Sequence, residues 1–165
     1  MIRKILILCG LILALSTSAM AQSGQTSEVR KQVLSLVSKY EQKSGFDAMT
    51  TVKGKGLELI KVMMRKEFGK EFIKGVNIIV IIDYSAVSQS DAQMLRSDLQ
   101  KIKKYCEQAE IPAEVLKEEK GVTDLMFRFD SNKEYMTDFI LLHEEAKERM
   151  MVYFGGKIKA DPYLF

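Results

Sequence analysis

The sequence of 165 residues predicts an α+β fold. Helical periodicity dominates its first two thirds, a near-continuous β-branched run, "VNIIVIIDY", interrupts it at 76–84, and a period of two takes over in the last third. Helices that come early and strands that come late are typical of α+β domains. We expect two layers: a mixed sheet of about six strands with helices mainly on one face, in the order α-β-α-β-α-β-β-β-β.

The first 21 residues have the pattern of a secretory signal peptide. Arg3 and Lys4 form a positive start, 5–15 form an apolar stretch, and Ala-Met-Ala at 19–21 is a small-x-small cleavage site. We expect cleavage before Gln22. The predicted location of the mature chain is therefore periplasmic or secreted, in the cell envelope or beyond it.

Cys9 lies within this apolar stretch and raises the question of a membrane anchor. The stretch has 11 residues, whereas a membrane-spanning helix needs roughly 20, so no integral span is expected in the mature chain. Cys9 follows only four apolar residues, too early for the cysteine at which a lipoprotein is cut. We therefore do not expect lipid anchoring at Cys9.

The composition of the mature chain excludes some classes of function. Removing residues 1–21 takes away two basic residues and no acidic ones, which leaves 23 Lys and Arg against 22 Asp and Glu, a net charge of +1. Without a basic excess, no nucleic-acid partner is expected. Cys106 is the only cysteine left, so no intrachain disulfide is available. We expect a flexible leader at 22–28 and a single domain at 29–165 with a short C-terminal tail.

The first elements follow from apolar spacing. A helix is predicted at 29–40, a modest strand at 45–52 and a second helix at 57–73. The β-branched run at 76–84 then predicts a strand buried on both faces, in the middle of the sheet. The first helix is amphipathic, and its apolar positions are Val29, Val33, Leu36, Val37 and Tyr40.

The later elements follow from caps and turns. Ser88 with Asp91, or Ser90 with Gln93, forms a capping box for a helix that runs to about Ala109. Turn-prone segments then separate four short stretches with a period of two, which predicts an antiparallel meander. The four predicted strands lie at 113–119, 123–129, 136–144 and 149–158.

The order of these segments resembles a known family. An exported leader, the opening "SKYEQKSGFDAMTTV", a Met-rich helix, a lone aliphatic strand and the closing "FILLHEE" and "MMVYFGGKI" look like the domain of unknown function 4252 family. The resemblance implies a small cell-envelope or secreted protein. It supplies no activity and no catalytic residues.

An enzyme site is the alternative that the sequence offers. Asp83, Tyr84 and Ser85 lie at the C-terminal end of the predicted central strand, where ligands bind in open α/β sheets. A nucleophilic serine needs a base, usually histidine, and the only histidine is His143. Asp and Ser also favour turns and helix caps for local reasons. The sequence therefore favours a structural turn at 83–85 and keeps a small hydrolase as the alternative.

Cofactors and metals find little support in the sequence. Gly54 and Gly56 separate a strand from a helix, but neither a P-loop nor a dinucleotide-binding loop is present. One mature cysteine and one histidine do not supply the usual ligands of tetrahedral zinc. His143 with Glu144 and Glu145 is the one combination that offers weak metal ligation at a turn. We expect no cofactor and no metal.

The function predicted from the sequence is a non-catalytic protein-interaction module with an unidentified envelope protein as its partner. The expected contact surfaces are the sheet face without helices, the amphipathic segment 29–40 and the C-terminal residues Tyr163, Leu164 and Phe165. A carrier of a hydrophobic ligand between sheet and helices is a further alternative. An unpaired edge strand also leaves room for association with a second copy of the chain.

Overall fold

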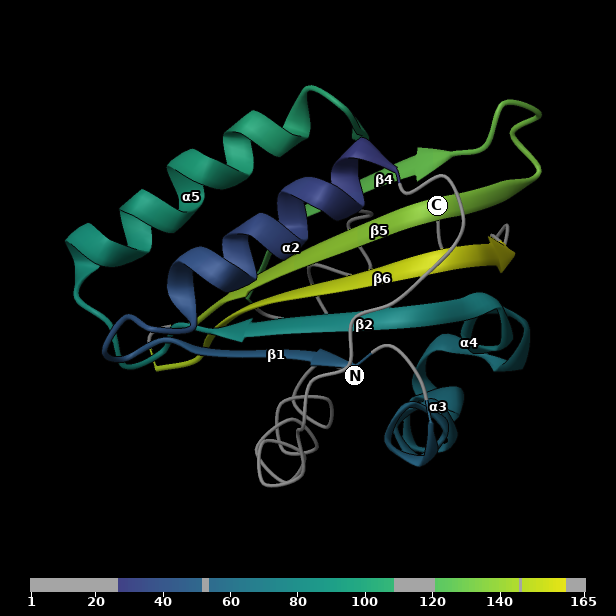
Figure 1. Cartoon of the computed structure of the whole chain (residues 1–165), viewed down its shortest axis with the longest axis horizontal. Helices are drawn as coiled ribbons and strands as arrows, with labels where there is room; N and C mark the ends of the chain where they lie inside the picture. Colours follow the sequence, from purple (N-terminus) through teal and green to yellow (C-terminus); the bar gives the residue numbers. More distant parts are fainter. Residues whose placement is uncertain (1–26, 52–53, 109–120, 146, 160–165) are drawn as a thin grey trace.

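The computed structural model describes residues 27–51, 54–108, 121–145 and 147–159. These residues form four helices and one sheet (Figure 1). The helices are α2 (Glu28–Tyr40), α3 (Lys55–Phe68), α4 (Lys70–Gly75) and α5 (Gln89–Lys103). The strands are β1 (Asp47–Thr51), β2 (Val76–Asp83), β3 (Glu107–Gln108), β4 (Val122–Phe129), β5 (Tyr135–Glu144) and β6 (Arg149–Lys159).

The predicted α+β class is confirmed, as is a sheet of about six strands. The strand order is β1-β2-β6-β5-β4-β3, so β2, β6 and β5 lie in its middle. The last three predicted strands correspond to β4, β5 and β6, which form an antiparallel meander. The strand predicted at 113–119 lies outside the described residues.

The prediction of a mixed sheet is wrong. Every pairing between described strands is antiparallel. The near-continuous apolar run of β2 suggested a parallel neighbour because such runs are common where both faces of a sheet are covered. Here the same burial occurs in an antiparallel sheet, because both neighbours of β2 run opposite to it.

The prediction that helices lie mainly on one face is also wrong. The helices α2 and α5 cover one face, and α3 and α4 cover the other (Figure 1). Successive residues of a strand point to opposite faces, and both sets are apolar in the middle of β2, β5 and β6. The molecule therefore has three layers and two separate hydrophobic cores.

Local signals explain where most helices begin and end. Ser27 and Ser88 cap α2 and α5, each accepting a hydrogen bond from the backbone three residues on. The helix predicted at 57–73 is instead divided into α3 and α4 at Gly69, whose φ of 80° is incompatible with a continuing helix.

The predicted helix to about Ala109 ends earlier. The last residue of α5 is Lys103, and the chain has already joined β4 as the strand β3 at Glu107. Cys106 falls within the predicted helix range but follows the observed helix, and it packs half-buried against the α2/α5 core. Pairing with the edge of β4 therefore ends the helical course of the chain before Pro112 is reached.

Candidate functional site

The candidate site lies at the end of the sheet where β2 finishes and β5 turns into β6. Glu145 and Glu148 exchange two backbone hydrogen bonds there, of 2.7 and 3.3 Å, which close the connection between β5 and β6. The sheet register places Asp83 of β2 opposite Met150 of β6, and Met150 opposite His143 of β5. The sheet thus brings most of the polar residues singled out in the sequence to one end.

Tyr84 belongs to a buried polar pair at this end. Its hydroxyl donates a 2.7 Å hydrogen bond to Oε1 of Glu144, and Nε of Arg96 donates to the same oxygen at 2.7 Å. Burial and the hydrogen bond to Glu144 raise the pKa of Tyr84 far above its ordinary value. Glu144 likewise raises the pKa of Arg96 through its hydrogen bond. The three side chains tie α5 to the ends of β2 and β5.

Asp83 and Ser85 form a local turn. The backbone N–H of Ser85 donates to Oδ1 of Asp83 at 2.8 Å. The Ser85 hydroxyl accepts from the backbone N–H of Arg149 at 2.9 Å and donates to the Arg149 carbonyl at 3.3 Å. The Arg149 guanidinium in turn donates to the carbonyl oxygens of Ser85 and Val87. These bonds join the end of β2 to the start of β6.

The alternative of a serine hydrolase requires Ser85 and His143 to meet. Ser85 follows β2 and His143 belongs to β5, and the strand β6 lies between β2 and β5. Neighbouring strands are about 4.8 Å apart. The backbones of β2 and β5 are therefore separated by about 10 Å. A catalytic serine and its base need to lie within hydrogen-bond reach, about 3 Å, and the Ser85 hydroxyl is directed at the backbone of Arg149.

A pocket of about 390 Å³ opens between α5 and the sheet beside these residues. Ligand pockets are mostly lined by apolar and aromatic side chains, whereas this one is polar. The pair formed by Arg96 and Glu144 already neutralises part of its charge. Its lining residues are Gln89, Arg96, Thr123, Glu144, Glu145 and Arg149.

The residues that could hold a metal ion differ from the combination considered in the sequence. Glu144 accepts hydrogen bonds from Tyr84 and Arg96. The third residue close to His143 and Glu145 is Glu148. One ligand atom from each of His143, Glu145 and Glu148 lies within 4.8 Å of the others. Sequence reasoning missed Glu148 because its approach depends on the register of the hairpin. The spacing of two residues between His143, near the end of β5, and Glu145, just after it, was the visible signal.

The structure changes two of the predicted contact surfaces. The apolar side chains of the segment 29–40 are buried in the α2/α5 core, and the sheet has helices on both faces. The expectation of a sheet face without helices is therefore wrong. The segment 29–40 uses its apolar side chains to close the fold, so only its polar side is open to contact. The predicted contact residues Tyr163, Leu164 and Phe165 lie outside the described residues.

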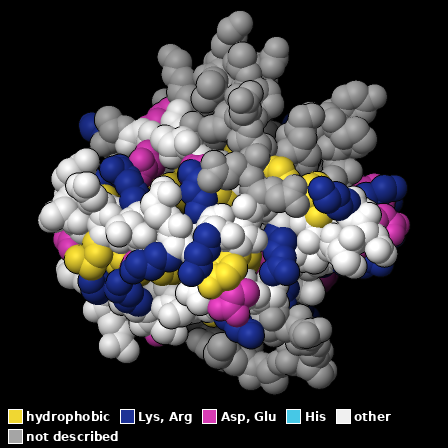
Figure 2. Space-filling model, turned by 90° about the horizontal axis from the view of Figure 1, so that it is seen from above, with side chains coloured by type: hydrophobic (Ala, Val, Ile, Leu, Met, Phe, Trp, Pro, Cys, Tyr) yellow, Lys and Arg dark blue, Asp and Glu magenta, His cyan; other side chains and the backbone are white. Residues whose placement is uncertain are grey.

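The outer surface of α2 and α5 carries an excess of positive charge. The segments 27–44 and 88–105 together contain eight Lys and Arg and four Asp and Glu. Figure 2 shows many more basic than acidic side chains on the side that it presents. We call this surface the basic helical face. Its exposed lysines are Lys31, Lys39, Lys101 and Lys104, and Lys43 is half-buried.

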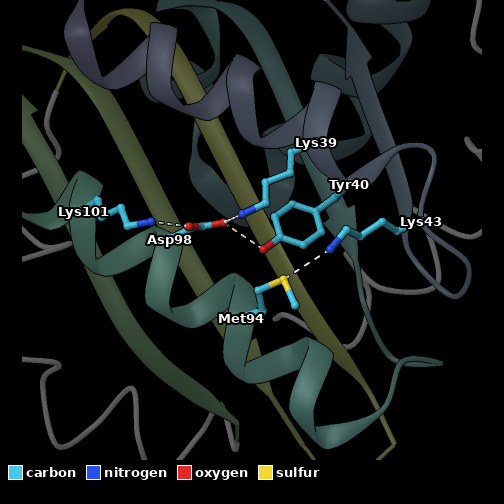
Figure 3. A network of polar contacts seen from close by, with 6 residues as sticks. All are labelled: Lys39, Tyr40, Lys43, Met94, Asp98 and Lys101. Atoms are coloured by element: carbon cyan, nitrogen blue, oxygen red, sulfur yellow. Dashed lines mark hydrogen bonds and ion pairs between the residues drawn. The ribbon is translucent and has the colours of Figure 1, made fainter.

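The carboxylate of Asp98 is buried, so one of the few negative charges of this face does not reach the surface (Figure 3). It is 7% exposed and accepts hydrogen bonds from Lys39, Lys101 and the Tyr40 hydroxyl. Burial alone raises the pKa of Asp98, but these hydrogen bonds outweigh burial and lower the pKa to about 2. The lysine side chains remain exposed by 43% and 70%, respectively.

Apolar side chains also reach the solvent on the helices. Met94 and Tyr105 are 40% and 36% exposed at α5 and just after it, and Leu59 and Val62 are 50% and 60% exposed on α3. Burial raises the pKa of the Cys106 thiol to about 12, which disfavours the reactive thiolate form. The basic helical face therefore combines lysines with single apolar side chains.

Comparisons with known proteins give no relative. No protein-family model matches the chain, and neither a curated protein nor a solved structure matches it. The resemblance to the domain of unknown function 4252 family therefore gains no support. In the part of the chain that the structure describes, no helix combines the length and apolar character needed to cross a membrane.

Proposed function

We propose that the protein is an exported, non-catalytic interaction module that binds an acidic protein of the cell envelope through its basic helical face. The observation that carries the proposal is the twofold excess of basic over acidic residues in the two segments that form this face. The other residues of the mature chain have a net charge of −3, and the helices on the opposite face, 55–75, have six Lys and Arg against three Asp and Glu. A positive surface steers an oppositely charged partner and increases its rate of association.

The chemistry of the face suits a protein partner. Met94 and Tyr105 are exposed among the lysines, and methionine and tyrosine are enriched at the centres of protein interfaces, whereas lysine belongs to their rims. The lysine Nζ of Lys104 lies 4.8 Å from the centre of the Tyr105 ring. A partner with carboxylates around an apolar centre would match this arrangement.

The end of the sheet supports a binding role more than a hydrolytic one. Tyr84 and Ser85 are engaged in hydrogen bonds that join β2, β5, β6 and α5. Their polar atoms thus have a structural use that accounts for their position. A non-catalytic role requires nothing further from them.

The proposal is tested by crosslinking in living cells, followed by capture of a tagged copy and identification of the crosslinked proteins by mass spectrometry. The test variant carries Lys31→Glu, Lys43→Glu and Lys104→Glu, which reverse charges of the basic helical face that do not contact Asp98. The matched control carries Lys55→Glu, Lys66→Glu and Lys70→Glu on the opposite helical layer, where these lysines are also exposed. Both triple variants change the net charge equally.

We expect an acidic protein that crosslinks to the wild type and to the control variant but not to the test variant. Binding of the purified pair should weaken with salt, because surface charges are screened over about 10 Å at 0.1 M ionic strength. Equal crosslinking of both variants would refute the basic helical face as the binding surface. Loss of binding on truncation after Asp161 alone would assign it to the tail residues Tyr163–Phe165 instead. Binding to anionic lipid vesicles without a crosslinked protein would replace the protein partner by a membrane surface.

A further inference from the structure

Three ligating side chains converge at the connection between β5 and β6. His143 and Glu145 are two residues apart along the chain, and alternate residues of a strand share a face. Glu148 faces Glu145 across the connection, because the two residues exchange both backbone hydrogen bonds. His143 in turn lies opposite Met150, a residue of the α3/α4 core. The hairpin geometry therefore brings the imidazole and the two carboxylates to one side.

One carboxylate of the cluster is only partly hydrogen-bonded. Oε2 of Glu148 is buried and has no hydrogen-bond partner among the described residues, although burial of a carboxylate oxygen without a partner is costly. The ligand atoms of Glu145 and Glu148 lie within 4.8 Å of each other, so two negative charges are held close together. The neighbouring imidazole of His143 is only 2% exposed. A cation is the group that would compensate these charges.

The backbone also makes room for the cluster. Gly121 has a φ of 96°, and a Cβ at this position would lie 2.5 Å from both Cγ of Glu145 and Cε1 of His143. The Gly121 carbonyl accepts a 2.6 Å hydrogen bond from the backbone N–H of Glu144. A residue without a side chain thus lets the backbone before β4 pass close to the ligating side chains.

We propose that His143, Glu145 and Glu148 bind a divalent transition-metal ion of the zinc type. One imidazole and two carboxylates provide mixed nitrogen and oxygen ligands, which suit zinc, whereas magnesium and calcium prefer oxygen ligands throughout. Three protein ligands leave at least one coordination position for water or for a side chain of a partner. This site is separate from the basic helical face and does not depend on the proposed function.

The test uses the histidine itself, because His143 is the only histidine in the chain. The ¹⁵N-labelled protein is prepared without a histidine tag and stripped of metal, and its imidazole signals are followed by two-dimensional NMR during titration with ZnCl₂. We expect one saturable change of the His143 signals at a 1:1 ratio. Carboxylates elsewhere on the surface would bind zinc without moving these signals. An equal amount of MgCl₂ should leave them unchanged.

The Glu148→Gln variant keeps the shape of the side chain and removes one ligand. We expect its zinc affinity to fall at least about tenfold. The metal-free variant should melt at the same temperature as the wild type or higher, because a buried unpaired charge is removed. The matched control is Glu134→Gln in the connection between β4 and β5, where Glu134 is exposed. It should bind zinc like the wild type.

These measurements separate a metal site from a structural cluster. Zinc should raise the melting temperature of the wild type and of Glu134→Gln, because a ligand that binds only the folded state stabilises it, and should not raise that of Glu148→Gln. His143 signals that stay unchanged at saturating zinc would overturn the proposal. An identical response of Glu148→Gln would overturn the ligand set, and an equal response to MgCl₂ would overturn the zinc-type chemistry.

Discussion

On the α3/α4 side of the sheet, phenylalanine rings fill the core, whereas on the α2/α5 side the fully buried aromatic side chains are tyrosines. The phenylalanine rings contact one another with centroid distances of 5.1 to 6.1 Å. Edge-to-face and offset contacts of this kind add to the burial of apolar area. The contacting rings are Phe68, Phe72, Phe139 and Phe154.

Each tyrosine on the other side donates to a carboxylate. The Tyr40 hydroxyl donates to Asp98 at 2.9 Å, and the Tyr84 hydroxyl donates to Glu144 at 2.7 Å. The third bond joins the Tyr153 hydroxyl to Asp138 at 2.7 Å. Asp138 is fully buried and also accepts from the hydroxyls of Ser27 and Thr137.

The difference shows two ways of fixing helices on one sheet. Ring packing holds α3 and α4 by shape, whereas directed hydrogen bonds hold α2 and α5 in one position. Buried polar bonds are directional, and leaving one unmade carries a penalty. Tyr153 and Phe154 are neighbours in β6 and belong to opposite cores. Adjacent residues of one strand therefore take part in the two kinds of contact, hydrogen bonding and ring packing.

The largest effect is expected from Phe154→Ala. Phe154 is fully buried and contacts three other phenylalanine rings, so the substitution removes a large apolar group and leaves a cavity. We expect the free energy of unfolding to fall by about 3–5 kcal/mol, measured by urea denaturation. The control Phe154→Leu should cost clearly less. A loss as small as that of Phe154→Leu would show that this core collapses around the gap and is not fixed by shape.

A smaller effect with a defined pH dependence is expected from Asp98→Asn. The pKa of Asp98 is lowered from 3.8 to about 2 in the folded protein, so its ionised form stabilises the fold above pH 4. This stabilisation is about 2 kcal/mol at neutral pH and is lost as the pH falls from about 4 to about 2. Urea denaturation at several pH values should show this loss in the wild type.

The Asp98→Asn variant should be less stable than the wild type at pH 7, and the gap should close toward pH 2. The control is Asp47→Asn at the first residue of β1, where Asp47 is exposed. Asp91→Asn is not suitable, because Asp91 belongs to the cap of α5. A constant difference between wild type and Asp98→Asn across this range would contradict the role given to the lysines.

The sequence was sufficient for the elements that depend on local signals. Ser88 begins α5 as predicted, and the apolar positions of α2 from Val29 to Tyr40 are those that are buried. The strands β4, β5 and β6 also lie close to the predicted ranges, although burial in the middle of β5 and β6 is continuous and does not alternate. Caps and periodicity are encoded within a few residues, so no tertiary information is needed to find them.

The layering and the site could not be predicted in the same way. An apolar run such as that of β2 predicts that both faces of the strand are covered. It does not indicate which helices cover them or whether the neighbouring strands are parallel. Glu148 joins His143 only through the register of the hairpin, and Arg96 reaches Glu144 from a position 48 residues away. These contacts depend on how separate elements pack, which residue spacing does not encode.

The smallest effects on the free energy of unfolding are expected from substitution of the two serine caps. These substitutions compare the N-termini of α2 and α5, the two helices that cover the tyrosine-containing core. Ser88 caps α5 at the surface, so Ser88→Ala should cost about 1 kcal/mol, the usual value of a cap. Ser27 caps α2 in the same way, but its hydroxyl also donates to the buried Asp138 at 2.7 Å. Ser27→Ala therefore removes a hydrogen bond to a buried carboxylate in addition to the cap.

We expect Ser27→Ala to destabilise the protein by about 1–2 kcal/mol more than Ser88→Ala, because hydrogen bonds to charged groups contribute more than those between neutral groups. Paired urea denaturation curves of the two variants measure this difference. In the background of Asp138→Asn, the excess cost of Ser27→Ala should shrink, since the acceptor is no longer charged. Equal costs of the two serine substitutions would mean that the Asp138 network contributes nothing at α2, and the contrast between the two cores would then rest on the tyrosines alone.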